Sequence, residues 1–189
     1  MKYFISCFTL FYGYAVVRYH LGKGLDQTYF LFVLNKSFAW SASFYLGISI
    51  LNLPRKWPTK QQFGLASFAL GLIHIMLTLY LAFSNFYPEL YKENHLSNLG
   101  VSILFSGMFS IGLMLMAFLT SILPDRFPKK WLRCGYFAFI VNISHPFIIG
   151  FQNWVAPLKW PLYFPPITLL ACLISGIILY FRWKQKREK

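Results

Sequence analysis

Acidic residues are scarce in this chain of 189 residues: five Asp and Glu accompany 18 Lys and Arg, and the formal net charge is +13. The basic residues lie in short segments between long apolar runs, which is typical of membrane topology and not of a nucleic-acid-binding surface. We therefore expect no nucleic-acid partner. The apolar runs contain no carboxylate, which a transporter coupled to protons or sodium would need there.

Cysteine is also rare. Cys7, Cys134 and Cys172 each lie in or at the edge of an apolar run, and no CxxC spacing occurs. This distribution favours small packing residues over a disulfide or a metal site. The chain has no GxGxxG motif, internal repeat or low-complexity stretch, so we expect no nucleotide-binding domain.

Apolar and aromatic residues dominate the chain. Hydrophobic residues make up 57% of it and aromatic residues 21%, and the mean hydropathy is +0.52, which no soluble domain of this size matches. A membrane-spanning helix needs roughly 20 apolar residues. Six segments qualify: 3–17, 29–53, 63–83, 99–123, 131–151 and 161–181. The first lacks a convincing cleavage site, so we expect a retained helix. Pro165 and Pro166 predict a late start for the sixth helix.

The loop charges set the expected orientation. Basic residues concentrate after the second and fourth segments and in the C-terminal tail: Arg55, Lys56, Lys60, Arg126, Lys129, Lys130, Arg133, Arg182, Lys184, Lys186, Arg187 and Lys189. By the positive-inside rule these loops and both termini are cytoplasmic. The sequence thus predicts an all-α integral membrane protein, a six-transmembrane-helix bundle forming a single domain over residues 1–189. We expect it in the cytoplasmic (inner) membrane, in contact with membrane lipid.

Lys36 lies several positions inside the second apolar segment. It either snorkels to the outer interface or indicates that the helix begins near Ser37. A functional cation is a third interpretation.

Two of the four histidines, His74 and His145, lie within expected spans, where a buried polar ring needs a partner. They lie roughly 16 Å and 21 Å beyond the cytoplasmic starts of their helices, at about 1.5 Å per residue, so we expect them to be level within a turn. A stripe of small residues precedes each histidine on the same face of its helix, with the same spacing in both helices. The expected helix 99–123, which lies between these two in the sequence, carries a similar stripe. The stripes are Gly64, Ser67 and Gly71; Gly135, Ala138 and Asn142; and Ser102, Ser106 and Ser110.

Two interpretations of this pattern stay open. In the first, the small residues only pack helices, and the histidines hydrogen-bond to neighbouring backbone or hydroxyl groups. In the second, two neutral imidazoles hold one metal between opposite helices. Because no Cys, Asp or Glu lies at that depth, a zinc or di-metal site lacks ligands, whereas two facing histidines suit the axial positions of a haem. The other histidines, His20 and His95, fall in expected outer loops.

Three stretches of the chain resemble the STEAP family of metalloreductases. The family's third transmembrane helix is similar to TKQQFGLASFALGLIHIMLTLYLA, and its fourth-to-fifth helix region to TSILPDRFPKKWLRCGYFAFIVNISHPFIIGFQNW. Its last helix, with a double proline at the start, is similar to YFPPITLLACLISGIILYF. The resemblance covers about residues 50–181, and the chain is more distantly similar to the wider ferric-reductase-like domain. Many members of that wider group hold two haems on histidines thirteen residues apart, but Gln61 and Leu132 stand at those positions here, so one haem is implied.

The resemblance implies that His74 and His145 are the axial ligands of one haem b. It also implies electron flow from a cytoplasmic-side flavin (FAD), near Lys60, Gln62 and Trp131, to an outer acceptor such as ferric or cupric ion. STEAP reductases carry a cytoplasmic NADPH-binding domain that this chain does not contain, so a separate cytoplasmic reductase or a quinone would supply the electrons. The trimers of the family imply a homo-oligomer.

We therefore expect a transmembrane oxidoreductase component that needs a separate electron donor. Two other functions stay open: a quinone-linked haem subunit that serves a periplasmic partner enzyme, and a haem-free membrane scaffold or transporter. In the last case the histidines only join helices. A basic patch in the expected outer loops, made of Lys23, Lys92 and Lys159, would attract a negatively charged ferric chelate. Weak metal ligands lie in the same loop as Lys92: Glu89, Glu93 and His95.

Overall fold

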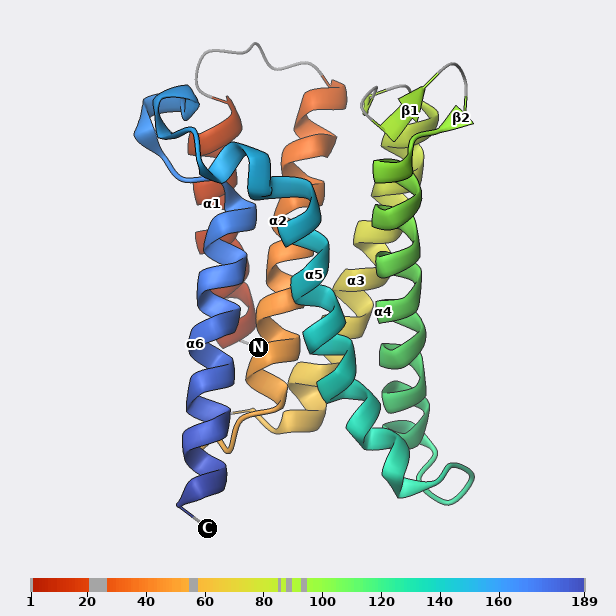
Figure 1. Ribbon diagram of the computed structural model, residues 1–189. Coiled ribbons are helices and arrows are strands. Elements are labelled where there is room, and N and C mark those ends of the chain that lie inside the picture. Colours follow the sequence, from red (N-terminus) through yellow and green to blue (C-terminus); the bar gives the residue numbers. More distant parts are fainter. Residues whose placement is uncertain are drawn as a thin grey trace.

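The computed structural model describes residues 2–20, 27–54, 58–84, 86–87, 90–92 and 95–188. Its six long helices are α1 (Lys2–His20), α2 (Gln27–Ser49), α3 (Lys60–Phe83), α4 (Asn98–Ile122), α5 (Cys134–Trp154) and α6 (Ile167–Arg187). Helix makes up 84% of the structure, which confirms the predicted helical class. The sequence did not predict the short antiparallel hairpin of β1 (Tyr91–Lys92) and β2 (His95–Leu96) that precedes α4 (Figure 1).

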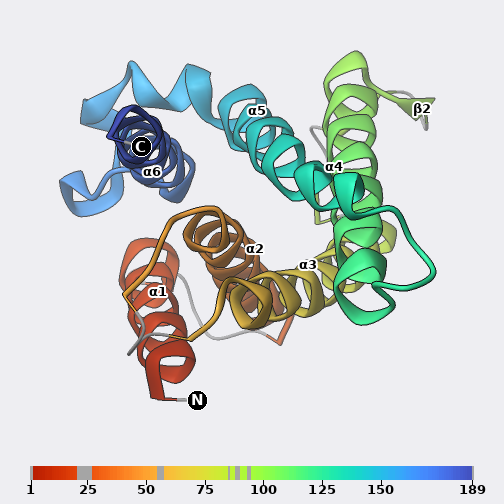
Figure 2. The ribbon, with the colours of Figure 1, turned by 90° about the horizontal axis from the view of Figure 1, so that it is seen from below.

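The helices stand side by side and enclose the histidine region within a ring of four. Each helix from α2 to α5 packs against its neighbour in the chain, and α2 also packs against α5. Viewed along the bundle, α3 and α5 therefore occupy opposite corners of this ring (Figure 2). Helices α1 and α6 both pack on α2, outside the ring. The ring is the part of the fold that positions the candidate site.

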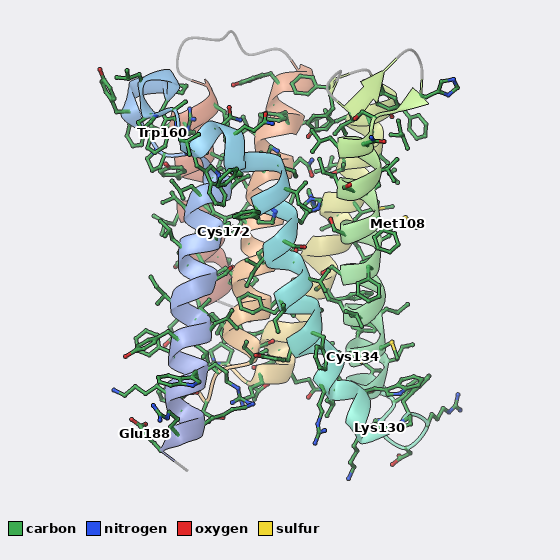
Figure 3. All side chains as sticks on the ribbon, viewed as in Figure 1. Met108, Lys130, Cys134, Trp160, Cys172 and Glu188 are labelled. Atoms are coloured by element: carbon green, nitrogen blue, oxygen red, sulfur yellow. The ribbon has the colours of Figure 1, made fainter. Side chains whose placement is uncertain are left out.

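The two ends of the bundle differ in their connections. The hairpin end carries β1, β2 and the α5–α6 connection, which contains the short 3-10 helices η3 (Pro157–Lys159) and η4 (Pro161–Tyr163). The tail end carries the α2–α3 connection, the 3-10 helix η2 (Lys129–Arg133) and the C-terminal residues. Trp160 lies at the hairpin end, and Lys130 and Glu188 lie at the tail end (Figure 3).

Within the described part of the chain, four helices are long and apolar enough to cross a membrane, and they indicate a membrane protein. They are Lys60–Phe83, Asn98–Ile122, Lys129–Trp154 and Ile167–Arg187. Large apolar side chains cover their outward faces: Met76, Phe105 and Met108 are 71%, 71% and 72% exposed. Such surfaces are stable where lipid replaces water.

The helix ends follow local chemistry. Thr59 accepts a hydrogen bond from the Gln62 amide, and the Gln62 side chain accepts one from the Thr59 amide, so α3 begins with a capping box. Helix α6 begins at Ile167, directly after Pro166, which confirms the predicted late start. The suggestion that the second helix begins near Ser37 is wrong, because α2 already begins at Gln27.

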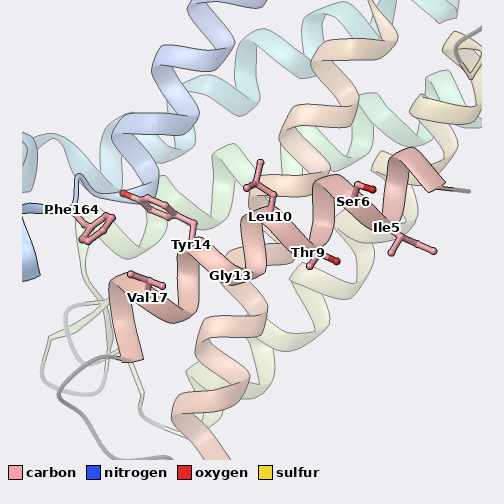
Figure 4. A pocket seen from close by; sticks show the side chains of 8 residues that line it. All are labelled: Ile5, Ser6, Thr9, Leu10, Gly13, Tyr14, Val17 and Phe164. Atoms are coloured by element: carbon pink, nitrogen blue, oxygen red, sulfur yellow. The ribbon is translucent and has the colours of Figure 1, made fainter.

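Helix α1 is anchored to its neighbours by aromatic rings and two tyrosine hydroxyls. Phe11 stacks on Trp40 of α2, with ring centroids 4.3 Å apart. Tyr45 Oη donates to Phe4 O at 2.6 Å, and Tyr14 Oη donates to Pro165 O at 2.6 Å. The outward face of α1 carries a shallow, largely apolar groove of about 720 Å³ (Figure 4). Its lining consists of Ile5, Ser6, Thr9, Leu10, Gly13, Tyr14, Val17 and Phe164.

Candidate functional site

The two intramembrane histidines come from opposite corners of the four-helix ring and lie at a similar level. A Cβ on Gly107 of α4 would lie 3.7 Å from His145 Cε1, and a Cβ on Gly71 of α3 would lie 3.5 Å from Ile111 of α4. His74 is about one turn beyond Gly71. Because α3 and α4 are antiparallel, one turn beyond Gly71 corresponds to about one turn before Ile111, which is the position of Gly107. The histidines are thus level within about a turn, in agreement with the sequence spacing.

Asn35 of α2 fixes the proton on the His74 ring. His74 Nδ1 lies 2.6 Å from Asn35 Oδ1. The amide nitrogen of Asn35 donates to Thr78 Oγ1 at 3.0 Å and to Tyr87 Oη at 3.3 Å. In this orientation the amide nitrogen of Asn35 bonds the two hydroxyls, and its carbonyl oxygen faces the ring. An oxygen of this kind only accepts, so His74 Nδ1 carries the proton.

Ser106 of α4 does the same for His145. Ser106 Oγ lies 3.1 Å from His145 Nδ1 and donates its own proton to Ile103 O at 3.0 Å. The hydroxyl proton is therefore already used, and Ser106 Oγ accepts from His145 Nδ1–H. Both rings are held as the same neutral tautomer by a helix other than their own.

This shared tautomer leaves the lone pair on the Nε2 atom of each ring. Neither Nε2 atom has a hydrogen-bond partner in the described part of the chain. A histidine that binds a metal through Nε2 characteristically donates its Nδ1–H to an oxygen, as both rings do here. Among the described residues, no three or more His, Cys, Asp or Glu gather as a metal site. The donor set is thus two imidazoles, which fits the axial positions of a haem, whose macrocycle supplies the other four nitrogen ligands.

The small residues of the three stripes join neighbouring helices. Ser102 is exposed and bonds only its own helix, whereas four other side chains of the stripes bond across helices. One is Ser106, which accepts from His145. The other bonds are Ser67 Oγ to Ala42 O at 2.6 Å, Ser110 Oγ to Ala138 O at 3.2 Å, and Asn142 Nδ2 to Ser43 Oγ at 2.6 Å. Packing thus accounts for much of the stripes, as the first interpretation expected. It does not account for the two Nε2 lone pairs.

The three residues expected near a flavin lie at the tail end but each has a structural partner. Gln62 closes the capping box of α3. Lys60 Nζ donates to Asn52 Oδ1 at 2.8 Å. Trp131 packs on Phe127, with ring centroids 5.5 Å apart. The flavin site therefore stays a prediction.

Several expected outer residues lie outside the described part of the chain. Lys23, Glu89 and Glu93 are among them, as are the side chains of His20, Lys92 and Lys159. His95 lies in β2 and is exposed. The three cysteines are free thiols, and Figure 3 shows Cys134 near the tail end, well away from Cys172. Cys172 Sγ lies 3.7 Å from Ile143 O, two residues before His145, so the expectation that no cysteine lies at the depth of the histidines is wrong.

Asn35 is the site residue that the sequence reasoning missed. It is 1% exposed and connects His74, Thr78 and Tyr87. The available signal was a polar amide inside an apolar run, the same signal that identified the histidines. No protein-family model and no curated protein matches this chain.

Proposed function

We propose that this chain is a b-type haem protein that carries electrons across the membrane, with His74 and His145 as the axial ligands of one haem. One observation carries the proposal: two level imidazoles on opposite helices are held with Nδ1 protonated and Nε2 free. Haem supplies a one-electron iron couple, and an electron, unlike an ion, crosses such a centre without an aqueous pore.

The protein residues hold and shield this site. Asn35 and Ser106 orient the two rings and keep the correct nitrogen available. A buried apolar cluster formed mainly by the ring helices, which includes Phe68 of α3, Met114 of α4 and Phe139 of α5, keeps water away. A dry, low-dielectric surrounding favours the less charged state of an iron centre and contributes to its potential.

The direction of electron flow follows from the proposed topology. We place six spans in the cytoplasmic membrane with the tail end cytoplasmic, because the basic residues concentrate there. The donor is then a cytoplasmic-side flavin near Lys60, Gln62 and Trp131, a separate reductase or a quinone. The acceptor, such as a ferric or cupric ion, lies beyond the hairpin end. The resemblance of residues 50–181 to STEAP metalloreductases supports this assignment and a trimeric assembly.

A haem-free scaffold is the second candidate, because the bonds to Asn35 and Ser106 also tie α3 to α2 and α5 to α4. Visible spectra of the purified protein, oxidised and dithionite-reduced, separate the two functions. We expect a low-spin b-type spectrum that is lost in His74→Ala and in His145→Ala. His95→Ala, at an exposed position in β2, is the matched control and keeps the spectrum. A folded protein that stays colourless after haem-supplemented expression would refute the haem and support the scaffold function.

A further inference from the structure

A second cavity lies at the hairpin end of the bundle. Its volume is about 530 Å³, and its walls come from α1, α2, α5, α6, the α5–α6 connection and residues 86–87. Cavities of a few hundred Å³ formed where several elements converge are typical small-molecule sites. The lining does not include His74 or His145, so the cavity is separate from the site described above.

Two basic side chains line this cavity. Arg18 is 8% exposed, and its Nε donates to Pro165 O at 3.3 Å. Lys36 Nζ lies 5.1 Å from the Phe32 ring centroid and 5.8 Å from that of Tyr87. The described residues of the lining include no Asp or Glu. Arg18 is thus a positive charge held away from bulk water, which favours an anionic occupant.

Flat aromatic surfaces make up much of the remaining wall. Phenyl, phenol and indole rings from four different segments border the cavity. They are Tyr19, Tyr29, Phe32, Phe86, Tyr87 and Trp160. Aromatic rings bind other planar conjugated systems through stacked and edge-to-face contacts. The wall therefore selects for shape as well as for charge.

The cavity also connects to His74. Tyr87 borders it, and its hydroxyl accepts a hydrogen bond from Asn35 Nδ2 at 3.3 Å. Asn35 Oδ1 in turn accepts from His74 Nδ1 at 2.6 Å. An occupant is thus separated from the histidine by one tyrosine and one amide.

We propose that this cavity binds a small planar conjugated molecule that carries an acidic group. Arg18 and Lys36 bind the acidic group, and the aromatic rings stack on its conjugated plane. The closeness to His74 places this ligand beside the proposed electron carrier. That last link rests on the proposed function, whereas the binding itself does not.

Calorimetric titration of the full chain in phosphatidylcholine nanodiscs tests the binding. Naphthalene carboxylate is the probe, naphthalenemethanol is the same ring without the acid, and cyclohexanecarboxylate is an acid without the flat ring. We expect naphthalene carboxylate to bind at least about tenfold more tightly than either analogue, as one charge-assisted hydrogen bond implies. Equal binding of all three, or tighter binding of inorganic phosphate, would overturn the proposal.

Variants locate the site. We expect Lys36→Gln to weaken binding of naphthalene carboxylate about tenfold and Lys36→Arg to restore it. Lys130→Gln, at the tail end, removes the same charge elsewhere and leaves binding unchanged. Equal losses in Lys36→Gln and Lys130→Gln would refute the assignment. Arg18 also donates a hydrogen bond to the backbone at Pro165, so the Arg18→Gln variant could lose its fold. The Lys36 variants test the proposal without relying on it.

The same titration of the His74→Ala chain distinguishes this inference from the proposed function. We expect binding to persist within a few-fold, because His74 does not line the cavity. A colourless protein that still binds naphthalene carboxylate refutes the haem and keeps the cavity. A haem protein that does not bind it refutes the cavity alone.

Discussion

The hydrogen bond between Asn35 and His74 predicts a measurable shift in the midpoint potential of the proposed haem. At 2.6 Å, Asn35 Oδ1 is a close acceptor for Nδ1–H, and it makes the ring a stronger electron donor through Nε2. A more basic ligand stabilises the ferric state over the ferrous state. We therefore expect Asn35→Leu to raise the midpoint potential, and Asn35→Asp, whose carboxylate is a stronger acceptor, to lower it.

The size of the shift follows from the strength of one bond. A hydrogen bond contributes about 1 kcal/mol net, which corresponds to about 40 mV for a one-electron couple. We expect Asn35→Leu to raise the potential by up to about 40 mV if the whole bond acts on one oxidation state. Spectroelectrochemical titration of the reduced haem band measures this directly.

Asn142→Leu is the matched control for this experiment. Asn142 is also an amide that joins two helices, because its Nδ2 donates to Ser43 Oγ at 2.6 Å, but it does not bond a histidine ring. We expect the midpoint potential of the Asn142→Leu variant to equal that of the unmodified protein. Equal shifts in Asn35→Leu and Asn142→Leu, or shifts of the same sign in Asn35→Leu and Asn35→Asp, would refute the reasoning.

Two further predictions concern packing and topology. A Cβ on Gly47 would lie 2.7 Å from Ile178 Cδ1 and 2.8 Å from the Phe139 ring, so Gly47→Ala should lower the free energy of unfolding by about 1–3 kcal/mol. Gly176→Ala, where an added Cβ would meet nothing within 4 Å, should leave the free energy of unfolding unchanged or raise it. Thermal unfolding in detergent compares the two variants, and equal losses of stability would contradict the close packing at Gly47. For the topology, an impermeant maleimide added to intact cells should label Leu158→Cys, at the hairpin end, and not Glu188→Cys, both in a cysteine-free background. The reverse labelling would invert the proposed orientation.

The helical framework could be predicted because long apolar runs leave few alternatives. The expected segment 63–83 lies within α3, and 99–123 differs from α4 by one residue at each end. The second segment was harder, since α2 ends at Ser49 and not at 53. The hairpin of β1 and β2 was missed because strands of two residues show no periodicity.

The candidate site was predictable in its histidines but not in its hydrogen bonds. His74 and His145 were conspicuous as polar rings in apolar runs. Their partners Asn35 and Ser106 lie on other helices, and only the packing of the bundle brings them together. Gln62 shows the opposite case, because the spacing from Thr59 to Gln62 fits a capping box that could have been predicted from the sequence.

The buried amide of α2 has a consequence for how the protein is made. Asn35 finds its partners on α3 and at Tyr87, which the ribosome produces later, whereas Ser43 already donates to Ala39 O of its own helix. Until then the Asn35 side chain faces lipid or the insertion machinery without those bonds, and an unmet polar group in lipid is costly. Biogenesis of this protein should therefore retain α2 beside the translocon until α3 has emerged. A chain truncated after α2 should be treated by the cell as an unassembled fragment and degraded.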